Sequence, residues 1–126
     1  MQRVIIDMKN YVLGEAVEMA LRKNGDFQVI VVEKPEETAE KAFSIAATAV
    51  LMEVTGYPPY VLEERLKIRE EIHKRCPHCK IALMVDENSE KRAAEQVKQA
   101  KRDGLVDLFI YGSTSASYLV ALLDAL

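Results

Sequence analysis

The chain has 126 residues, of which 49% are hydrophobic and 29% charged, as expected of one globular domain. Its net charge of -3, with no basic cluster between aromatic residues, argues against a nucleic-acid or anionic-membrane surface. The chain shows no signal-peptide pattern and no apolar stretch near the ~20 residues of a membrane span, and its two cysteines share one tetrapeptide, so we expect a cytoplasmic location.

The first half of the chain predicts two strand-helix units. Residues 3–6 are a short β-branched run, and the apolar residues after Asn10, a candidate cap, repeat at helical spacing as far as the left-handed stop Asn24-Gly25. Residues 27–32 predict the second strand. Pro35 and the two glutamates after it predict the start of the second helix, since proline and acids both suit a first turn.

The third predicted strand is the stretch where we expect the functional site. Residues 49–54 form an apolar run interrupted only by Glu53, and a Thr-Gly pair and a proline-containing turn follow. A continuous apolar run bounded by such breakers suits a strand covered on both faces of a parallel sheet. Ligands and chemistry gather at the carboxyl ends of such strands, so Glu53 is the first candidate for a working residue.

The longest predicted helix runs from about residue 60 to residue 75, and Pro77 stops it. Arg65 and Arg69 interrupt its apolar stripe on the same side. We expect both arginines at the edge of the stripe, with their stems packed and their guanidinium groups in water.

The last two units continue the alternation. Residues 81–85 predict the fourth strand, Asn88 or Ser89 caps the next helix, and Asp103-Gly104 closes it. Residues 105–111 predict the fifth strand, before a final apolar helix. Five strand-helix units in strict alternation, with no linker, predict one α/β domain over residues 1–126, with a parallel sheet covered by helices on both faces.

In three places the chain resembles the receiver domains of bacterial two-component response regulators. Residues 3–7 resemble the receiver's first strand ending in acids, residues 48–53 resemble the strand that ends in the phosphoacceptor aspartate, and residues 104–110 resemble the run into the last strand. The resemblance implies a flavodoxin-like (βα)5 three-layer sandwich with strand order 2-1-3-4-5. It also implies a place in two-component signal transduction and phosphorelay, with a histidine kinase or an effector protein as partner.

The residues at the receiver's active-site positions depart from the family pattern. Asp7 is not followed by the second acid that helps receivers to hold Mg²⁺, and the phosphoacceptor position is Glu53. The hydroxyl residue expected after the fourth strand is Val85, with Asp86 next to it, and the expected lysine is Tyr111. Phosphoryl transfer depends on positioning and charge neutralisation, so the chain resembles a pseudo-receiver that is not phosphorylated in the ordinary way and is not an enzyme.

Three interpretations of Glu53 stay open. It mimics a phosphorylated aspartate, it binds a metal ion together with Asp7, or it is a solvated acid at the end of a strand. Asp7 and Asp86 complete the expected acidic pocket, and a weakly bound Mg²⁺ would take Asp7 and Glu53 as ligands. A receiver that keeps Mg²⁺-dependent phosphoacceptance at Asp7 and Glu53 is therefore the first alternative function.

Cys76-Pro77-His78-Cys79 matches the tetrapeptide of thioredoxin-like disulfide oxidoreductases, which makes a small thiol-redox protein the second alternative. In that family the first cysteine begins a helix, whose dipole lowers the thiol pKa. Here a helix ends at the motif, which favours a helix stop followed by a turn. Zinc binding with His73 and His78 is disfavoured, because structural zinc sites draw their ligands from two separated pairs.

The final helix is apolar around most of its circumference between Tyr118 and Leu126. Such a helix needs burial on more than one side. In receivers the face formed by the fourth helix, fifth strand and fifth helix often mediates dimerisation, and the resemblance implies a homodimer with Tyr118, Leu119 and Leu122 as interface candidates. The alternative is that these residues pack within one chain.

Overall fold

The structure, a computed structural model, describes residues 1–24 and 26–126. Its described residues form a parallel five-stranded sheet in the order β2-β1-β3-β4-β5. The strands are β1 (Gln2–Asp7), β2 (Phe27–Val31), β3 (Ala49–Val54), β4 (Lys80–Val85) and β5 (Leu108–Tyr111). The α/β prediction and the strand order implied by the resemblance are therefore confirmed.

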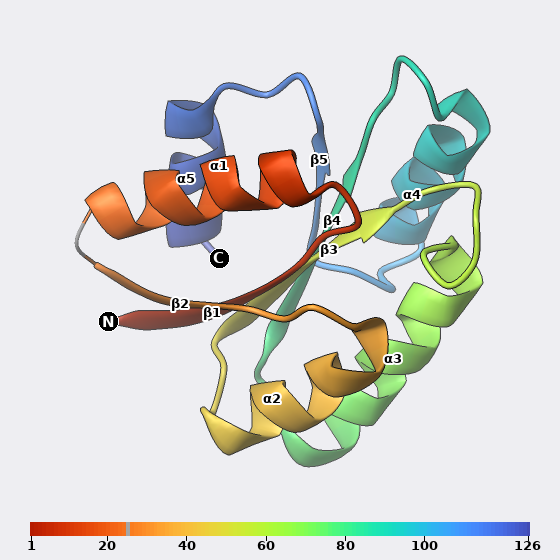
Figure 1. The fold of residues 1–126 in the computed structure, drawn as a ribbon. Coiled ribbons are helices and arrows are strands. Elements are labelled where there is room, and N and C mark those ends of the chain that lie inside the picture. The colour runs from red at the N-terminus through yellow and green to blue at the C-terminus, as the bar shows by residue number, and fades with distance from the viewer. Residues whose placement is uncertain (25) are drawn as a thin grey trace.

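The helices cover both faces of the sheet, as Figure 1 shows. On one face lie α1 (Tyr11–Lys23) and α5 (Ala116–Asp124). On the other face lie α2 (Thr38–Ser44), α3 (Leu62–Arg75) and α4 (Lys91–Arg102). A short 3-10 turn, Pro35–Glu37, precedes α2. None of the helices in the described part of the chain is long and apolar enough to span a bilayer.

The central strand β3 is buried along its whole length. Its side chains alternate between the two layers of the core, as the pleat of a strand requires. Val50, Met52 and Val54 pack under α2, α3 and α4, whereas Ala49 and Leu51 pack under α1 and α5. The continuous apolar run in the sequence thus corresponds to a strand with a helix layer on each side.

The start of α1 is as predicted, whereas the start of α4 is not. Asn10 caps α1, where its Oδ1 accepts a hydrogen bond from the Leu13 N–H at 3.1 Å. Glu90, not Asn88 or Ser89, stands at the N-cap of α4, and Asn88 and Ser89 belong to a turn in which their N–H groups donate to Asp86. The predicted stop of α1 lies partly outside the described residues, since Gly25 is not described; Asn24 has right-handed backbone angles.

The fifth strand is shorter than predicted. It begins at Leu108, and the residues before it form a turn. The Asp107 carboxylate accepts a hydrogen bond from the Ile81 N–H at 2.9 Å, and this contact takes the place of a ladder bond at the entrance to β5. A polar side chain that satisfies a neighbouring strand's N–H ends the regular pairing early.

Candidate functional site

The candidate site lies where the strand order reverses, between β1 and β3. Asp7 ends β1 and is in register with Met52 of β3, one residue before Glu53. Because the connections after β1 and β3 run in opposite directions along the sheet, the carboxyl ends of these strands form the crevice where open α/β sheets bind ligands. The positions of Asp7 and Glu53 therefore agree with the prediction, but their partners do not.

Arg65 fills the space beside Asp7 and is 0% exposed, so the prediction that its guanidinium lies in water is wrong. Its Nη1 donates to Asp7 Oδ2 at 2.7 Å, and its Nη2 donates to Asp7 Oδ1 at 3.2 Å. Nη2 also donates to the Asp7 carbonyl at 3.1 Å, and Nε donates to the Glu53 carbonyl at 2.8 Å. Such a bidentate, charge-assisted arrangement compensates the cost of burying a guanidinium group.

Two further side chains complete the surroundings of this ion pair. The Thr38 hydroxyl, on α2, donates to Asp7 Oδ2 at 2.6 Å. The Tyr60 ring covers the guanidinium of Arg65, whose central carbon lies 4.9 Å from the ring centroid. Both oxygens of Asp7 thus have partners inside the protein, and the pair joins the end of β1 to α2 and α3.

Glu53 is 7% exposed, which rules out the interpretation that it is a solvated acid at the end of a strand. Its Oε1 accepts a hydrogen bond from the backbone N–H of Asn10 at 2.8 Å. That N–H belongs to the N-cap residue of α1, so the Glu53 carboxylate fixes the start of the helix. Whether Glu53 also mimics a phosphorylated aspartate is a question of function.

Asp86 shares no hydrogen bond with Asp7 or Glu53 among the described residues, so the predicted acidic pocket of Asp7 and Asp86 stays a prediction. Asp86 is exposed and accepts N–H bonds within its own loop, from Asn88 at 3.0 Å and Ser89 at 3.4 Å. Hydrogen bonds to the Asp86 carboxylate lower its pKa, the one from the Ser89 hydroxyl most and the one from the Asn88 N–H less. Asp7, Glu53 and Asp86 therefore bind to three different partners.

The site does not fit a resident divalent cation. Mg²⁺ requires near-ideal octahedral oxygen geometry, and here a guanidinium group already uses both oxygens of Asp7. Among the described residues, no three histidine, cysteine, aspartate or glutamate side chains lie together as a metal site would require. This holds also for His73 and His78 with the two cysteines. The positive charge beside Asp7 is instead the guanidinium group of Arg65, which α3 supplies.

The two altered switch positions are paired neighbours in the sheet. Val85 is fully buried, is in register with Tyr111 of β5, and accepts a hydrogen bond on its carbonyl from the Gly112 N–H at 2.8 Å. Tyr111 is 36% exposed, and its ring meets Phe109 edge to face at 5.5 Å between centroids. Val85 lacks the hydroxyl group, and Tyr111 lacks the ammonium group, that the family this chain resembles has at these two positions.

The cysteine motif forms a turn between α3 and β4, as the preference for a helix stop predicted. The Cys79 N–H donates to the Cys76 carbonyl at 3.1 Å, and His73 Nε2 lies 3.0 Å from the Cys79 carbonyl. Cys79 is buried, and burial first, then the neighbouring Cys76 and Asp107, raises the pKa of its thiol to about 12. A thiol that stays protonated is a poor nucleophile for disulfide exchange.

This burial predicts unequal reactivity of the two thiols. In the folded protein at mildly alkaline pH, iodoacetamide is expected to modify Cys76, which is partly exposed, and to leave Cys79 unmodified. Mass spectrometry of tryptic fragments measures the extent of labelling at each cysteine. Both thiols are expected to react in urea, and fast labelling of Cys79 in the folded protein would contradict the assignment.

The final helix divides its apolar residues between the core and the surface. Leu119 is 2% exposed and belongs to the core layer under α1 and α5, so its prediction as an interface residue is wrong. Leu122 is half-buried against the same layer, and Tyr118 is 60% exposed. The alternative of packing within one chain therefore holds for Leu119, and Tyr118 stays an interface candidate.

Residues that the sequence analysis did not assign to the site make most of it. Arg65, Thr38 and Tyr60 come from three different segments, and the backbone of Asn10 supplies the partner of Glu53. The one indication in the sequence was the position of Arg65 on the apolar stripe of its helix. A charged residue there needs either an edge position or a buried partner of opposite charge.

No protein-family model and no curated protein matches the chain. Solved structures match it over nearly its full length. A response regulator receiver domain protein (CheY-like) from Methanospirillum hungatei aligns with a TM-score of 0.78 and 15% identity, covering 99% of this chain and 92% of that one. A response regulator from Thermotoga maritima aligns with a TM-score of 0.75 and 20% identity, covering 99% and 96%.

A third structure represents a family of redox sensors in the streptococci that evolved from two-component response regulators. It aligns with a TM-score of 0.79 and 18% identity, and the match covers 99% of this chain and 50% of that one. At such identities the likeness concerns the fold. The chain has the fold of response-regulator receiver domains.

Proposed function

We propose that this protein is a receiver-like signalling module that acts by protein contact and does not accept a phosphoryl group. The observation that carries the proposal is the buried pair of Asp7 and Arg65. A phosphorylated receiver needs a divalent cation to neutralise the equatorial oxygens of the phosphoryl group. Here Arg65 holds the position beside Asp7, which supports a role without phosphoryl transfer.

Glu53 supports the same proposal. Its carboxylate is held by the Asn10 N–H, and its backbone carbonyl is held by Arg65. Glu53 thereby joins the start of α1 to α3, and this connection keeps the domain in one state, as a mimic of a phosphorylated aspartate would. The output of the module is then set by which partner is present, not by phosphorylation.

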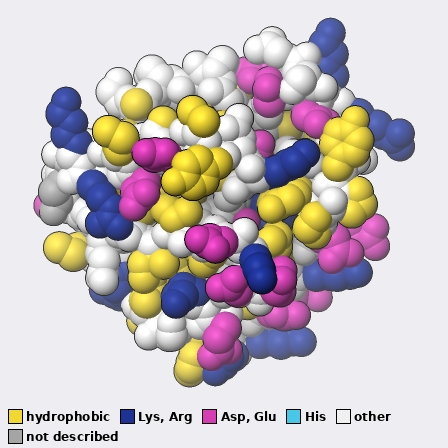
Figure 2. Space-filling view, in the orientation of Figure 1, with side chains coloured by type: hydrophobic (Ala, Val, Ile, Leu, Met, Phe, Trp, Pro, Cys, Tyr) yellow, Lys and Arg dark blue, Asp and Glu magenta, His cyan; other side chains and the backbone are white. Residues whose placement is uncertain are grey.

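The proposed partner is a protein, such as a histidine kinase or an effector. Figure 2 shows acidic and basic side chains interspersed on the viewed face, without a broad basic area of the kind that binds nucleic acid. By analogy with receivers, the face of α4, β5 and α5 is the proposed contact surface, and a homodimer through Tyr118, which is exposed there, is one form of it.

A phosphodonor experiment tests the proposal. The protein is incubated with Mg²⁺ and acetyl phosphate and its intact mass is measured, with a receiver domain of known phosphorylation as positive control. No phosphoryl adduct is expected, because Asp7 has no free oxygen for a metal ion. A stoichiometric adduct would overturn the proposal in favour of Mg²⁺-dependent phosphoacceptance at Asp7 and Glu53.

Thiol redox chemistry is the candidate from a different class, and a streptococcal structure with this fold is described as a redox sensor. The burial of Cys79 and the raised pKa of its thiol argue against the same role for Cys76 and Cys79 here. The labelling experiment on these cysteines decides between the two candidates.

A further inference from the structure

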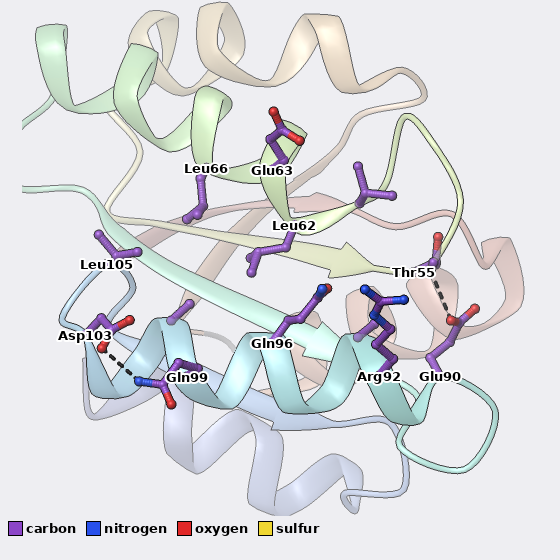
Figure 3. A pocket seen from close by; sticks show the side chains of 14 residues that line it. Thr55, Leu62, Glu63, Leu66, Glu90, Arg92, Gln96, Gln99, Asp103 and Leu105 are labelled. Carbon is purple, nitrogen blue, oxygen red and sulfur yellow. Dashed lines mark hydrogen bonds between the residues drawn. The ribbon is translucent and has the colours of Figure 1, made fainter.

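The face of the sheet that carries α2, α3 and α4 has an open groove between α3 and α4, shown in Figure 3. Its volume is about 710 Å³, within the size range of ligand and peptide sites. The floor is mostly apolar, and its largest side chains are Leu62 and Leu66 of α3 and Leu105 of the loop before β5. Leu105 is 37% exposed, so the chain itself leaves this apolar surface uncovered.

The rim of the groove is negative. Three of the four charged residues that line it are acidic, namely Glu63 in the first turn of α3 and Glu90 and Asp103 at the two ends of α4. None of the ion pairs found among the described residues includes these carboxylates. Among the described residues, Glu90 accepts a hydrogen bond from the Gly56 N–H and Asp103 accepts one from the Gln99 amide. Arg92 is the one basic residue of the lining, so the rim carries a net negative charge.

The geometry of the groove favours a helical occupant. Its α4 wall has 12 residues and is therefore roughly 18 Å long. Both walls are helices whose backbone groups bond within the helix, so an extended segment would find no ladder of free N–H and C=O groups to pair with. A helix satisfies its own backbone and needs only apolar side chains at i, i+4 and i+7 to fill such a groove.

We infer that this groove docks an amphipathic helix of a partner protein, with leucine-sized side chains on one face and lysine or arginine at both ends. The inference rests on the proposed function as a contact module and names the chemistry of the contact. Basic ends match Glu63 and Glu90 at one end of the groove and Asp103 at the other. The groove lies beside α3, the helix that carries Arg65, so the occupant would contact the element that holds the site together.

The test uses a fluorescent synthetic helix as probe. A peptide of about 15 residues, long enough to cover the groove, carries leucines at i, i+4 and i+7 and lysines at both ends. A matched peptide has glutamates in place of the lysines, and a scrambled peptide keeps the composition. Fluorescence anisotropy measures binding, and amide chemical-shift changes locate it on the full chain.

The lysine peptide is expected to bind saturably and to shift the amides of Leu62, Leu66 and Leu105, whereas the glutamate and scrambled peptides bind at least about tenfold more weakly. Glu63→Lys combined with Asp103→Lys is expected to lower the affinity for the lysine peptide about tenfold. Leu105→Lys is expected to have a similar effect. Val12→Lys, at a 75% exposed apolar residue of α1, is the matched control and leaves binding unchanged.

Equal binding of all three peptides, or shifts confined to α1 and α5, would overturn the inference. The same holds if the protein alone shows concentration-dependent shifts of the groove amides, because a second copy would then be the occupant. The phosphodonor experiment is independent of these outcomes. If the lysine peptide does not bind the groove and no phosphoryl adduct forms, the inference fails but the proposed function stands, with the face of α4, β5 and α5 as its contact surface.

Discussion

Replacement of Arg65 by methionine is expected to lower the free energy of unfolding by about 3–5 kcal/mol, the usual cost of removing one partner of a buried ion pair. Methionine keeps most of the length of the stem but none of the donors. Asp7 would then be a buried carboxylate with only the Thr38 hydroxyl and water as partners, at a residue that is 2% exposed. Urea unfolding followed by circular dichroism measures the loss.

Two further variants make this result specific to the pair. Arg69→Met removes a half-buried arginine of the same helix that has no ion pair among the described residues, and is expected to cost less than about 1 kcal/mol. Asp7→Asn in the Arg65→Met background removes the carboxylate that Arg65→Met leaves unpaired. The free energy of unfolding lost by the double variant should therefore be about 1–3 kcal/mol smaller than the sum of the losses of the two single variants. Strict additivity, or a loss of under 1 kcal/mol for Arg65→Met, would contradict the assignment.

A buried ion pair is weak support for stability in itself, because well-packed apolar residues in the same volume are often as stable. Its presence at the carboxyl end of β1 therefore calls for a reason other than stability. Arg65 supplies a positive charge beside Asp7 from within the chain. We propose that the local structure therefore needs neither an added ion nor a phosphoryl group.

The period of the apolar residues predicted the α/β class, and the resemblance to receivers added the strand order. Runs such as residues 49–54 suit strands buried on both faces, and their alternation with helical stripes favours a parallel sheet. The caps were less predictable. Asn88 and Ser89 have the right chemistry for an N-cap, but their N–H groups donate to Asp86 in a turn that places both residues before the helix. A sequence does not show which of two local hydrogen-bond patterns is preferred.

The candidate site was predicted in position but not in its contacts. Asp7 and Glu53 follow from strand ends, which the sequence pattern locates. Arg65 is 58 residues from Asp7 along the chain, and their pairing depends on how α3 crosses the end of the sheet. Helical spacing places Arg65 on the inner stripe but leaves undecided whether the guanidinium snorkels outward or turns to a buried acid. Only the three-dimensional structure distinguishes these two conformations.

Replacement of Leu119 by aspartate is expected to destabilise the protein by at least about 4 kcal/mol, comparable to the whole stability of a marginal domain. Leu119 is 2% exposed in the layer between α5 and the sheet, where it packs with residues such as Val17 and Leu123. The change removes a buried leucine and introduces a carboxylate that has no cation there to pair with. Thermal and urea unfolding measure the effect, and Leu119→Ala, expected to cost about 2–5 kcal/mol, gives a graded variant that still folds.

Tyr118→Asp is the matched comparison for Leu119→Asp, because it changes the neighbouring residue of the same helix at a side chain that is 60% exposed. Its stability is expected to stay within about 0.5 kcal/mol of the unchanged protein. A homodimer that uses the exposed side of α5 should dissociate on Tyr118→Asp, as sedimentation over a concentration series would show. Loss of a dimer on Leu119→Asp would instead reflect unfolding, so a test of dimerisation at α5 depends on Tyr118. If Leu119→Asp kept full stability, α5 would not be packed as the core of this fold requires.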